Sequence, residues 1–168
     1  MTKTDYLEID SDKLEHLFNG ELILLVTATD IETEYTHQKL TPLNGYNKIL
    51  QVYDGNYTYY FGLFGKYVVA HVQCAMGSVS RDSSIMTIST AVLKLKTKIV
   101  IMIGIAFGVD EEKQNIGDVL VAESVRPYNI KRVGEKNTID RGVEAPSSQM
   151  LLNRFKNING TWEHITDF

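Results

Sequence analysis

Three carboxylates follow the first long apolar run of the sequence and are its most suggestive chemical feature. Leu22 to Val26 is continuously apolar, and Asp30, Glu32 and Glu34 come soon after it. A carboxylate at such a position can hold a water or accept a proton. Acidic residues in a first helical turn also favour the helix dipole, which is the simpler interpretation. Because a helix turns by roughly 100° per residue, we expect at most one of the three to face a common pocket.

A second candidate is the glycine turn Gly104-Ile105-Ala106-Phe107-Gly108, which follows the apolar run Ile99 to Ile103. Glycine lets the backbone approach a ligand closely, although a tight turn after a strand uses it equally well. The turn lacks both the dinucleotide-binding glycine pattern and the lysine of a P-loop. Cys74 and His71 fall in a predicted strand, where we expect them to serve packing rather than catalysis.

Composition excludes several classes of function. With 168 residues, 43% hydrophobic and 23% charged, the chain is expected to be globular rather than disordered. The net charge of −4 makes nucleic acid and anionic membranes poor partners. One cysteine and four dispersed histidines predict no internal disulfide, no metal site and no cofactor. The first residues lack a signal peptide and no apolar run could span a membrane, so we expect a cytoplasmic protein.

The elements that must position these residues alternate between strands and helices. We expect fully buried strands at 22–26 and 99–103, and a strand at 119–122. A hairpin is expected over 47–64 around Asp54-Gly55-Asn56, followed by a strand at 67–74. Helices are expected over 31–40, capped by Thr29 or Asp30, and over 78–96 and 147–155.

This order predicts an α/β fold with a mixed, largely parallel central sheet flanked by helices. Residues 1–20 are expected to be a leader or linker, and 21–168 the α/β domain. In such sheets ligands bind beyond the carboxyl ends of the strands. Three segments mark those ends here, namely Thr27 to Glu32, Cys74 to Gly77, and Gly104 to Gly108.

Taken together, four segments in this order resemble the nucleoside phosphorylase/nucleosidase superfamily. They are Val26 to Glu34, Gln73 to Val79, Ile103 to Val109 and Ile116 to Val121. The resemblance covers roughly residues 20–155 and is nearest to the methylthioadenosine/S-adenosylhomocysteine nucleosidases. The region that holds Arg126-Pro127-Tyr128 and Arg132-Val133-Gly134 also resembles nucleosidase-like effector domains of bacterial defence proteins.

The resemblance implies hydrolysis of a purine N-glycosidic bond, with Glu32 in the position that orients the attacking water. It implies a purine nucleoside or nucleotide as the small-molecule partner, and a homodimer. The substrate-binding residues implied are Thr29, Met76, Gly77, Ala106, Phe107 and Gly108. No cation stands before Gly104 to hold phosphate, which favours water as the nucleophile and leaves phosphorolysis as an alternative.

Members of the family continue into a Met-Glu segment that grips the ribose hydroxyls and an aspartate that protonates the purine. No such segments follow Phe155. We therefore expect an N-terminal portion of the fold, truncated at its C-terminus, with little cleavage by this chain alone. The alternative is a non-catalytic domain that keeps the fold for nucleoside binding or assembly.

Overall fold

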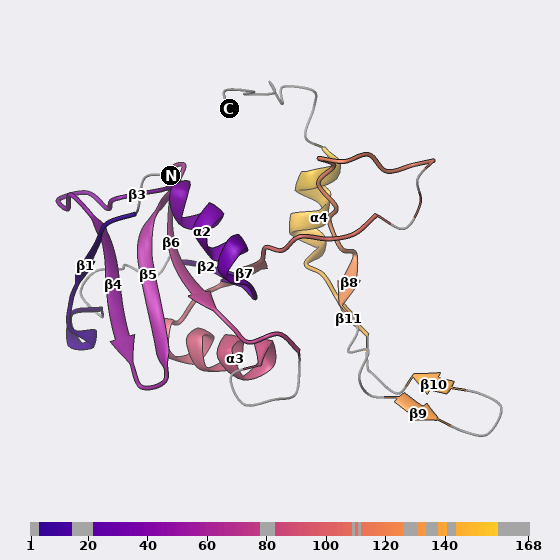
Figure 1. The fold of residues 1–168 in the computed structure, drawn as a ribbon, viewed down its shortest axis with the longest axis horizontal. Coiled ribbons are helices and arrows are strands. Elements are labelled where there is room, and N and C mark those ends of the chain that lie inside the picture. The colour runs from indigo at the N-terminus through magenta and orange to yellow at the C-terminus, as the bar shows by residue number, and fades with distance from the viewer. Residues whose placement is uncertain are drawn as a thin grey trace. The chain divides into compact units, whose positions relative to one another are not determined.

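The computed structural model describes residues 4–14, 22–77, 83–108, 110, 112–125, 131–133, 138–140 and 144–157. The chain divides into two compact units, Met1–Ile105 and Ala106–Phe168, and each is described by itself. Figure 1 shows the elements of both units in chain order.

The first unit is built on a seven-stranded sheet in the order β1-β4-β5-β6-β2-β7, with β3 beside β5. Strand β2, next to the end of this order, runs parallel to both β6 and β7, and β1 runs parallel to β4. The β4–β5, β5–β6 and β3–β5 pairs are antiparallel. The strands are β1 (Tyr6–Glu8), β2 (Ile23–Thr27), β3 (Leu40–Thr41), β4 (Ile49–Asp54), β5 (Tyr57–Phe64), β6 (Tyr67–Gln73) and β7 (Ile99–Met102). The mixed α/β sheet expected from the sequence is thereby confirmed.

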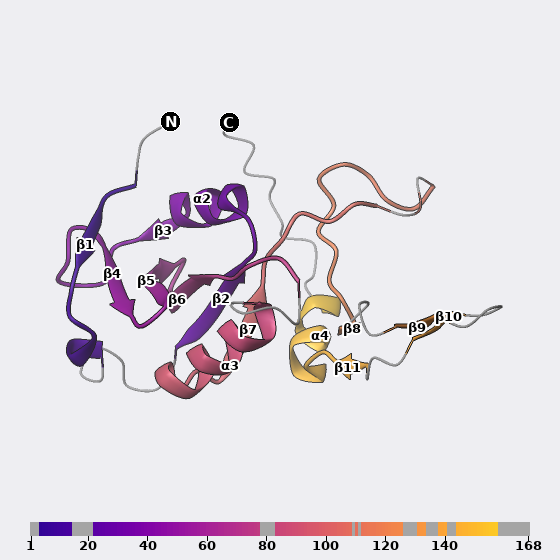
Figure 2. The same cartoon turned by 60° about the horizontal axis from the view of Figure 1, so that its bottom comes forward.

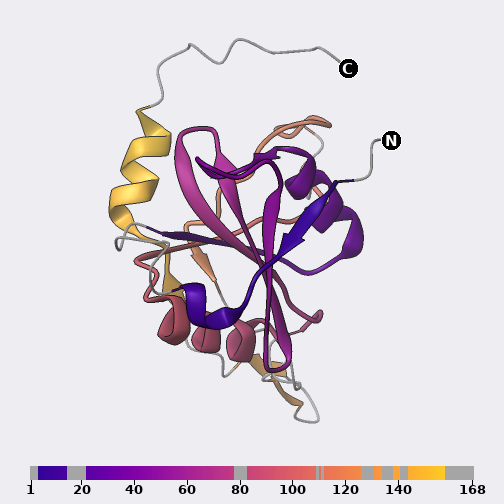
Figure 3. The ribbon, with the colours of Figure 1, turned by 90° about the vertical axis from the view of Figure 1, so that its left-hand side faces the viewer.

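Helices α2 (Asp30–Gln38) and α3 (Ser84–Leu95) lie on opposite faces of this sheet (Figures 2 and 3). A short 3₁₀ helix, η1 (Ser11–Lys13), follows β1. Neighbouring residues of one strand alternate between the two faces, so Leu24 belongs to the larger core cluster and Leu25 to the smaller one. The larger cluster includes Ala91 of α3. A sheet covered on both faces explains the continuous apolar run of β2.

Most elements expected from the sequence are present, with Thr29 as the N-cap of α2. One expectation about the first unit is wrong. Strand β7 is half-buried and Met102 is exposed, rather than fully buried. β7 is more exposed than expected because it lies at the end of the sheet order. Among the described strands, only β2 pairs with it. Residues 78–82 of the expected 78–96 helix lie outside the described residues.

The second unit contains short elements. Strand β8 (Ser124–Val125) pairs with β11 (Ala145–Pro146), β9 (Lys131–Val133) pairs with β10 (Thr138–Asp140), and α4 spans Gln149–Lys156. The expectation of a strand at 119–122 is wrong, because this stretch is irregular and the Val119 side chain is exposed. An apolar run becomes a strand only where a neighbour pairs its backbone. Within the described residues, no helix combines the length and apolarity that crossing a membrane requires.

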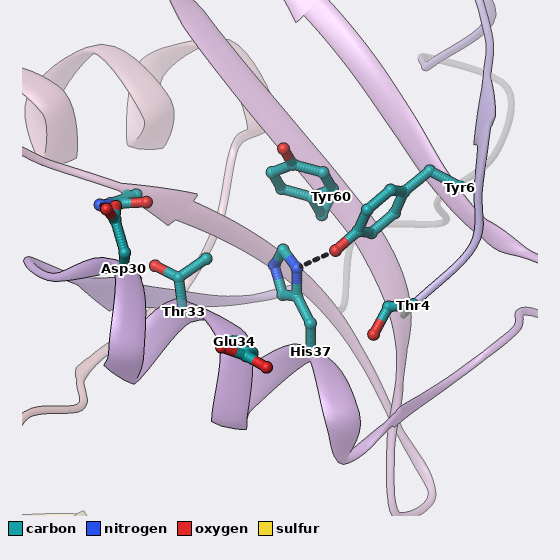
Figure 4. A pocket seen from close by; sticks show the side chains of 8 residues that line it. Thr4, Tyr6, Asp30, Thr33, Glu34, His37 and Tyr60 are labelled. Carbon is teal, nitrogen blue, oxygen red and sulfur yellow. Dashed lines mark hydrogen bonds between the residues drawn. The ribbon is translucent and has the colours of Figure 1, made fainter. Parts of the chain in front are cut away.

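A chain of polar side chains ties α2 to the sheet and to β1. The Tyr6 hydroxyl lies 2.7 Å from His37 Nδ1 (Figure 4), and His37 Nε2 lies 2.9 Å from His71 Nδ1. His71 Nε2 is 2.9 Å from the Thr27 hydroxyl, which is 2.7 Å from the Thr33 hydroxyl. Both imidazoles are buried, so each of these contacts replaces a hydrogen bond to water.

Two proton arrangements satisfy every member of this chain, one with hydrogen on Nε2 of both neutral rings and one, running in the opposite direction, with hydrogen on Nδ1 of both. If both rings are neutral and carry hydrogen on Nε2, Tyr6 donates to His37, His37 to His71, and His71 to Thr27. If both rings were doubly protonated, the His37 Nε2–H and the His71 Nδ1–H would face each other. Burial lowers the pKa of His37 to about 4, and burial with the neighbouring His37 lowers the pKa of His71 to about 3.

This arrangement predicts a loss of stability in mild acid. Both histidines have lower pKa values in the folded chain than the ordinary 6.5, so the unfolded chain binds more protons below that pH. The contribution of the two neutral histidines to the free energy of unfolding is complete above pH 6.5 and is lost as the pH falls toward 4. We expect the free energy of unfolding to fall by up to about 1.4 kcal/mol per pH unit for each histidine. Urea unfolding at pH 7.5, 6.5 and 5.5 measures this.

His37→Gln provides the comparison, because it removes one of the two titrating rings. Its free energy of unfolding should change less steeply over the same pH range. Proton NMR of the ring hydrogens checks the cause directly. Ordinary titration of both rings near pH 6.5 in the folded chain would contradict the prediction.

Candidate active site

Glu32 occupies the third position of helix α2, the helix that follows strand β2. The Thr29 hydroxyl accepts a hydrogen bond from the Glu32 backbone N–H at 3.3 Å. In return, Glu32 Oε2 accepts from the backbone N–H groups of Thr29 and Ala28, both at 3.0 Å. This reciprocal pair is a capping box, which satisfies backbone donors that a helix start otherwise leaves free. The carboxylate is therefore held against the first strand-to-helix turn.

The same carboxylate reaches the segment that follows β7. Glu32 Oε1 accepts a hydrogen bond from the Ile105 backbone N–H at 2.8 Å. A Cβ atom at Gly104 would lie 3.2 Å from Oε1, closer than most real Cβ contacts. Glycine at position 104 lets the backbone pass close to the Glu32 side chain. The sequence suggested such a close approach for a ligand. The close partner in the structure is Glu32.

These contacts set the charge of the carboxylate. Burial alone would raise the pKa of Glu32, but hydrogen bonds from Ile105, Ala28 and Thr29 outweigh it and lower the pKa from its ordinary value. Donors that point at a carboxylate favour its ionised form. Glu32 is therefore an anion at neutral pH, fixed in direction by three backbone donors.

The carboxyl ends of β6, β2 and β7 meet at this place, as the sequence predicts. The Cys74 backbone N–H donates to the Thr27 carbonyl at 2.9 Å, and the Ile103 backbone N–H donates to the Val26 carbonyl at 2.8 Å. The first unit thus brings the turn with Glu32 beside the segments after β6 and β7. Parallel strands share one carboxyl edge, which is where α/β sheets bind ligands.

The remaining candidate residues divide between the units. Thr29, Met76 and Gly77 belong to the first unit, in which Met76 is exposed and Gly77 has a φ of +101° that favours glycine. The Gly77 carbonyl accepts hydrogen bonds from the Ser84 backbone and hydroxyl, both at 3.2 Å. The other three candidates, Ala106, Phe107 and Gly108, fall in the second unit. The Phe107 side chain is strongly exposed.

Cys74 and His71 have the structural roles expected of them. The buried Cys74 thiol donates to the Thr27 carbonyl at 3.3 Å, and burial raises its pKa. A protonated thiol is a poor nucleophile. His71 has both ring nitrogens occupied by hydrogen-bond partners. Over the described ranges, no group of three or more His, Cys, Asp or Glu side chains is placed to hold a metal ion.

Comparison with known proteins decides the family. The model of the phosphorylase superfamily, which contains nucleoside phosphorylases and nucleosidases, matches residues 23–158. The chain belongs to this superfamily. The match includes both β2 with its Glu32 turn and the glycine turn after β7.

Two proteins are similar to this phosphorylase-superfamily chain, one in sequence and one in fold. It is 31% identical over 119 residues to a death domain-containing ATP nucleosidase of Amphimedon queenslandica, covering 67% of this chain and 22% of that protein. The fold is similar to that of an S-adenosylhomocysteine nucleosidase from Streptococcus pyogenes, solved with 5-methylthiotubericidin, with a TM-score of 0.62 and 22% identity. That match covers 83% of this chain and 57% of the solved chain. The chain thus spans about a fifth of the one relative and somewhat over half of the other.

Sequence reasoning missed the bond between Glu32 and Ile105. Two residues 73 positions apart carry no local signal of contact. The available signal was Gly104, whose missing side chain makes room for the carboxylate. The expectation that at most one of the three acidic residues faces a common pocket is wrong, because Asp30 and Glu34 line one cavity together. They lie four residues apart, on the same side of α2, and Glu32 does not line that cavity.

Thr29→Ala tests the capping box of this superfamily member. The variant loses the hydroxyl that accepts from the Glu32 backbone N–H, and we expect the free energy of unfolding to fall by about 1 kcal/mol. Urea denaturation at neutral pH measures the change. Thr29→Ser keeps an accepting hydroxyl and should stay near the parent chain. Equal losses for the two variants would show that the cap contributes nothing.

Gly104→Ala tests the close approach to the carboxylate. The added Cβ must push Glu32 Oε1 by a few tenths of an ångström and weaken the bond from the Ile105 N–H. We expect the pKa of Glu32 to rise toward its ordinary value, as measured by ¹³C NMR titration of the carboxyl carbon. Ile105→Ala is the control, because it keeps the backbone donor. An unchanged pKa in Gly104→Ala would contradict this account.

Proposed function

We propose that this domain hydrolyses the N-glycosidic bond of a purine nucleoside or nucleotide, with Glu32 orienting the attacking water. The proposal is supported by membership of the superfamily and by the similarity to the ATP nucleosidase of Amphimedon queenslandica. The single observation that carries it is the fixed Glu32 carboxylate at the carboxyl edge of β6, β2 and β7. Thr29, Met76, Gly77, Ala106, Phe107 and Gly108 are proposed to bind the substrate.

The backbone hydrogen bonds of Glu32 leave one lone-pair site of its carboxylate, near which the Thr29 side chain also interacts, and we propose that a water binds there. A carboxylate has about four lone-pair sites, two on each oxygen. Oε2 accepts from two described backbone donors and Oε1 from one. The second site of Oε1 is therefore the place where a water can donate. A water held there has its oxygen lone pairs free for the sugar carbon.

The charge of Glu32 suits the transition state of glycosidic cleavage. Departure of the purine develops positive charge on the sugar, which a nearby fixed anion stabilises. A lowered pKa makes Glu32 a weak base, so its role is to orient the water and stabilise this charge. It accepts a proton only as the water attacks and becomes acidic.

Two alternatives make different demands on the same site. A phosphorylase would need a cation for phosphate, and the described strand end before Gly104 is apolar, Ile101-Met102-Ile103. A non-catalytic binding domain would keep the pocket and lose turnover. A cytoplasmic location, expected from the sequence, and a homodimer, expected from the family, are also part of the proposal.

Single-turnover assays with the chain in excess test the proposal. Methylthioadenosine, adenosine and ATP are incubated with and without phosphate, and adenine and the sugar product are separated by chromatography. We expect adenine release that depends on the Glu32 carboxylate. The sugar product should be free ribose or its 5′ derivative whether or not phosphate is present. Glu32→Gln should lower the rate at least about 100-fold.

The controls separate chemistry from folding. Glutamine at position 32 sets an amide NH₂ against at least one backbone donor, so the folded fraction of this variant is measured by circular dichroism. Glu8→Gln removes an exposed carboxylate on β1 and should leave the rate unchanged. Release that requires phosphate would favour the phosphorylase. Nucleoside binding without release would favour the binding domain, and release unaffected by Glu32→Gln would remove Glu32 from the mechanism.

A further inference from the structure

A separate cavity of about 270 Å³ lies between α2, β1 and the sheet. One face of α2 contributes Asp30, Thr33, Glu34 and His37, whose spacing places them along one side of the helix. The rest of the lining is Thr4, Tyr6, Tyr60 and Gln73. Figure 4 shows the four α2 side chains on one side, with Tyr6 and Tyr60 opposite His37. Because Glu32 is not among them, this cavity is not the site proposed for glycosidic cleavage.

Two carboxylates stand at the exposed rim of this cavity, each with accepting capacity left. Asp30 Oδ1 accepts from the Gln73 amide at 2.8 Å, and Glu34 Oε1 accepts from the Gln38 amide at 3.3 Å. In both cases the second carboxylate oxygen has no described partner. The ion pairs found among the described residues use other carboxylates. The rim therefore carries the two carboxylates of Asp30 and Glu34, whose described hydrogen-bond partners are the neutral amides of Gln73 and Gln38.

Aromatic rings form the wall behind the carboxylates. The Tyr6 and Tyr60 rings are 5.0 Å apart between centroids, and His37 is 4.4 Å from Tyr60. Ring faces attract cations and favour ammonium or guanidinium groups. The lowered pKa of His37 keeps that ring neutral at pH 7, so it does not repel a positive ligand. Aromatic rings beside carboxylates make a site for organic cations rather than anions.

We propose that this cavity binds a small organic cation, an ammonium or guanidinium group on a short apolar stem. The charged group lies between Asp30 and Glu34, and the stem lies against Tyr6 and Tyr60. The volume equals that of roughly nine waters in the liquid, which suits a ligand of about ten non-hydrogen atoms. The Thr4 and Thr33 hydroxyls and the Gln73 carbonyl supply further acceptors for N–H groups.

Amide NMR titrations of the full chain in low salt test this site with three probes of similar shape. They are butylammonium, butylguanidinium and the neutral 1-butanol. We expect both cations to shift the amides of Thr33, Glu34 and Gln73 saturably, with a dissociation constant on the order of 1 mM. Butanol should cause no saturable shift. Salt at 0.5 M should weaken cation binding several-fold, because the rim is exposed.

Charge-neutral variants locate the binding. Glu34→Gln should weaken both cations about 3-fold, and the double variant Asp30→Asn with Glu34→Gln about 10-fold. These exposed positions tolerate the change without loss of fold, which the spectrum itself reports. Asp12→Asn, on η1, is the matched control and should bind like the parent chain. The proposal is overturned if neither cation saturates by 20 mM, if butanol binds equally well, or if the double variant keeps full affinity.

Discussion

The Glu32 carboxylate is the point on which the architecture around the candidate active site depends. It joins the start of α2 to the segment that leaves β7, through backbone donors on both sides. Each of these donors would otherwise need water or another partner at the edge of the sheet. One side chain thus accepts hydrogen bonds from the backbone of two turns that lie far apart in the sequence. Its position and its ionisation follow from the same set of hydrogen bonds.

A catalytic carboxylate that also supports the fold has limited freedom. Such a group cannot swing toward a substrate without breaking contacts that stabilise the turn. Preorganisation of this kind avoids the cost of reorienting dipoles during the reaction. For the proposed reaction, this geometry favours a substrate that comes to a fixed anion over an anion that moves to the substrate.

Local patterns in the sequence predicted much of the fold. The apolar run of β2, the hairpin turn after Asp54 and the capping residue Thr29 each carry their signal within a few residues. The failures concern pairing at a distance. The apolar pattern of β7 does not say which strand lies on its second edge, and Val119 lies in an apolar run without a described strand partner. The chain Tyr6–His37–His71 spans three elements, so no window of the sequence contains it.

The pairing of β1 with β4 has a consequence for the order of folding during synthesis. β1 precedes the other described strands of its sheet, and its partner strand begins only at Ile49. A nascent chain therefore releases Tyr6 and its neighbours long before either β4 or His37 exists to receive them. The hairpin of β4 and β5 needs only a short loop and closes locally, whereas β1 must close a long one. Strand β1 is thus made before its partners and joins the sheet only after elements made later.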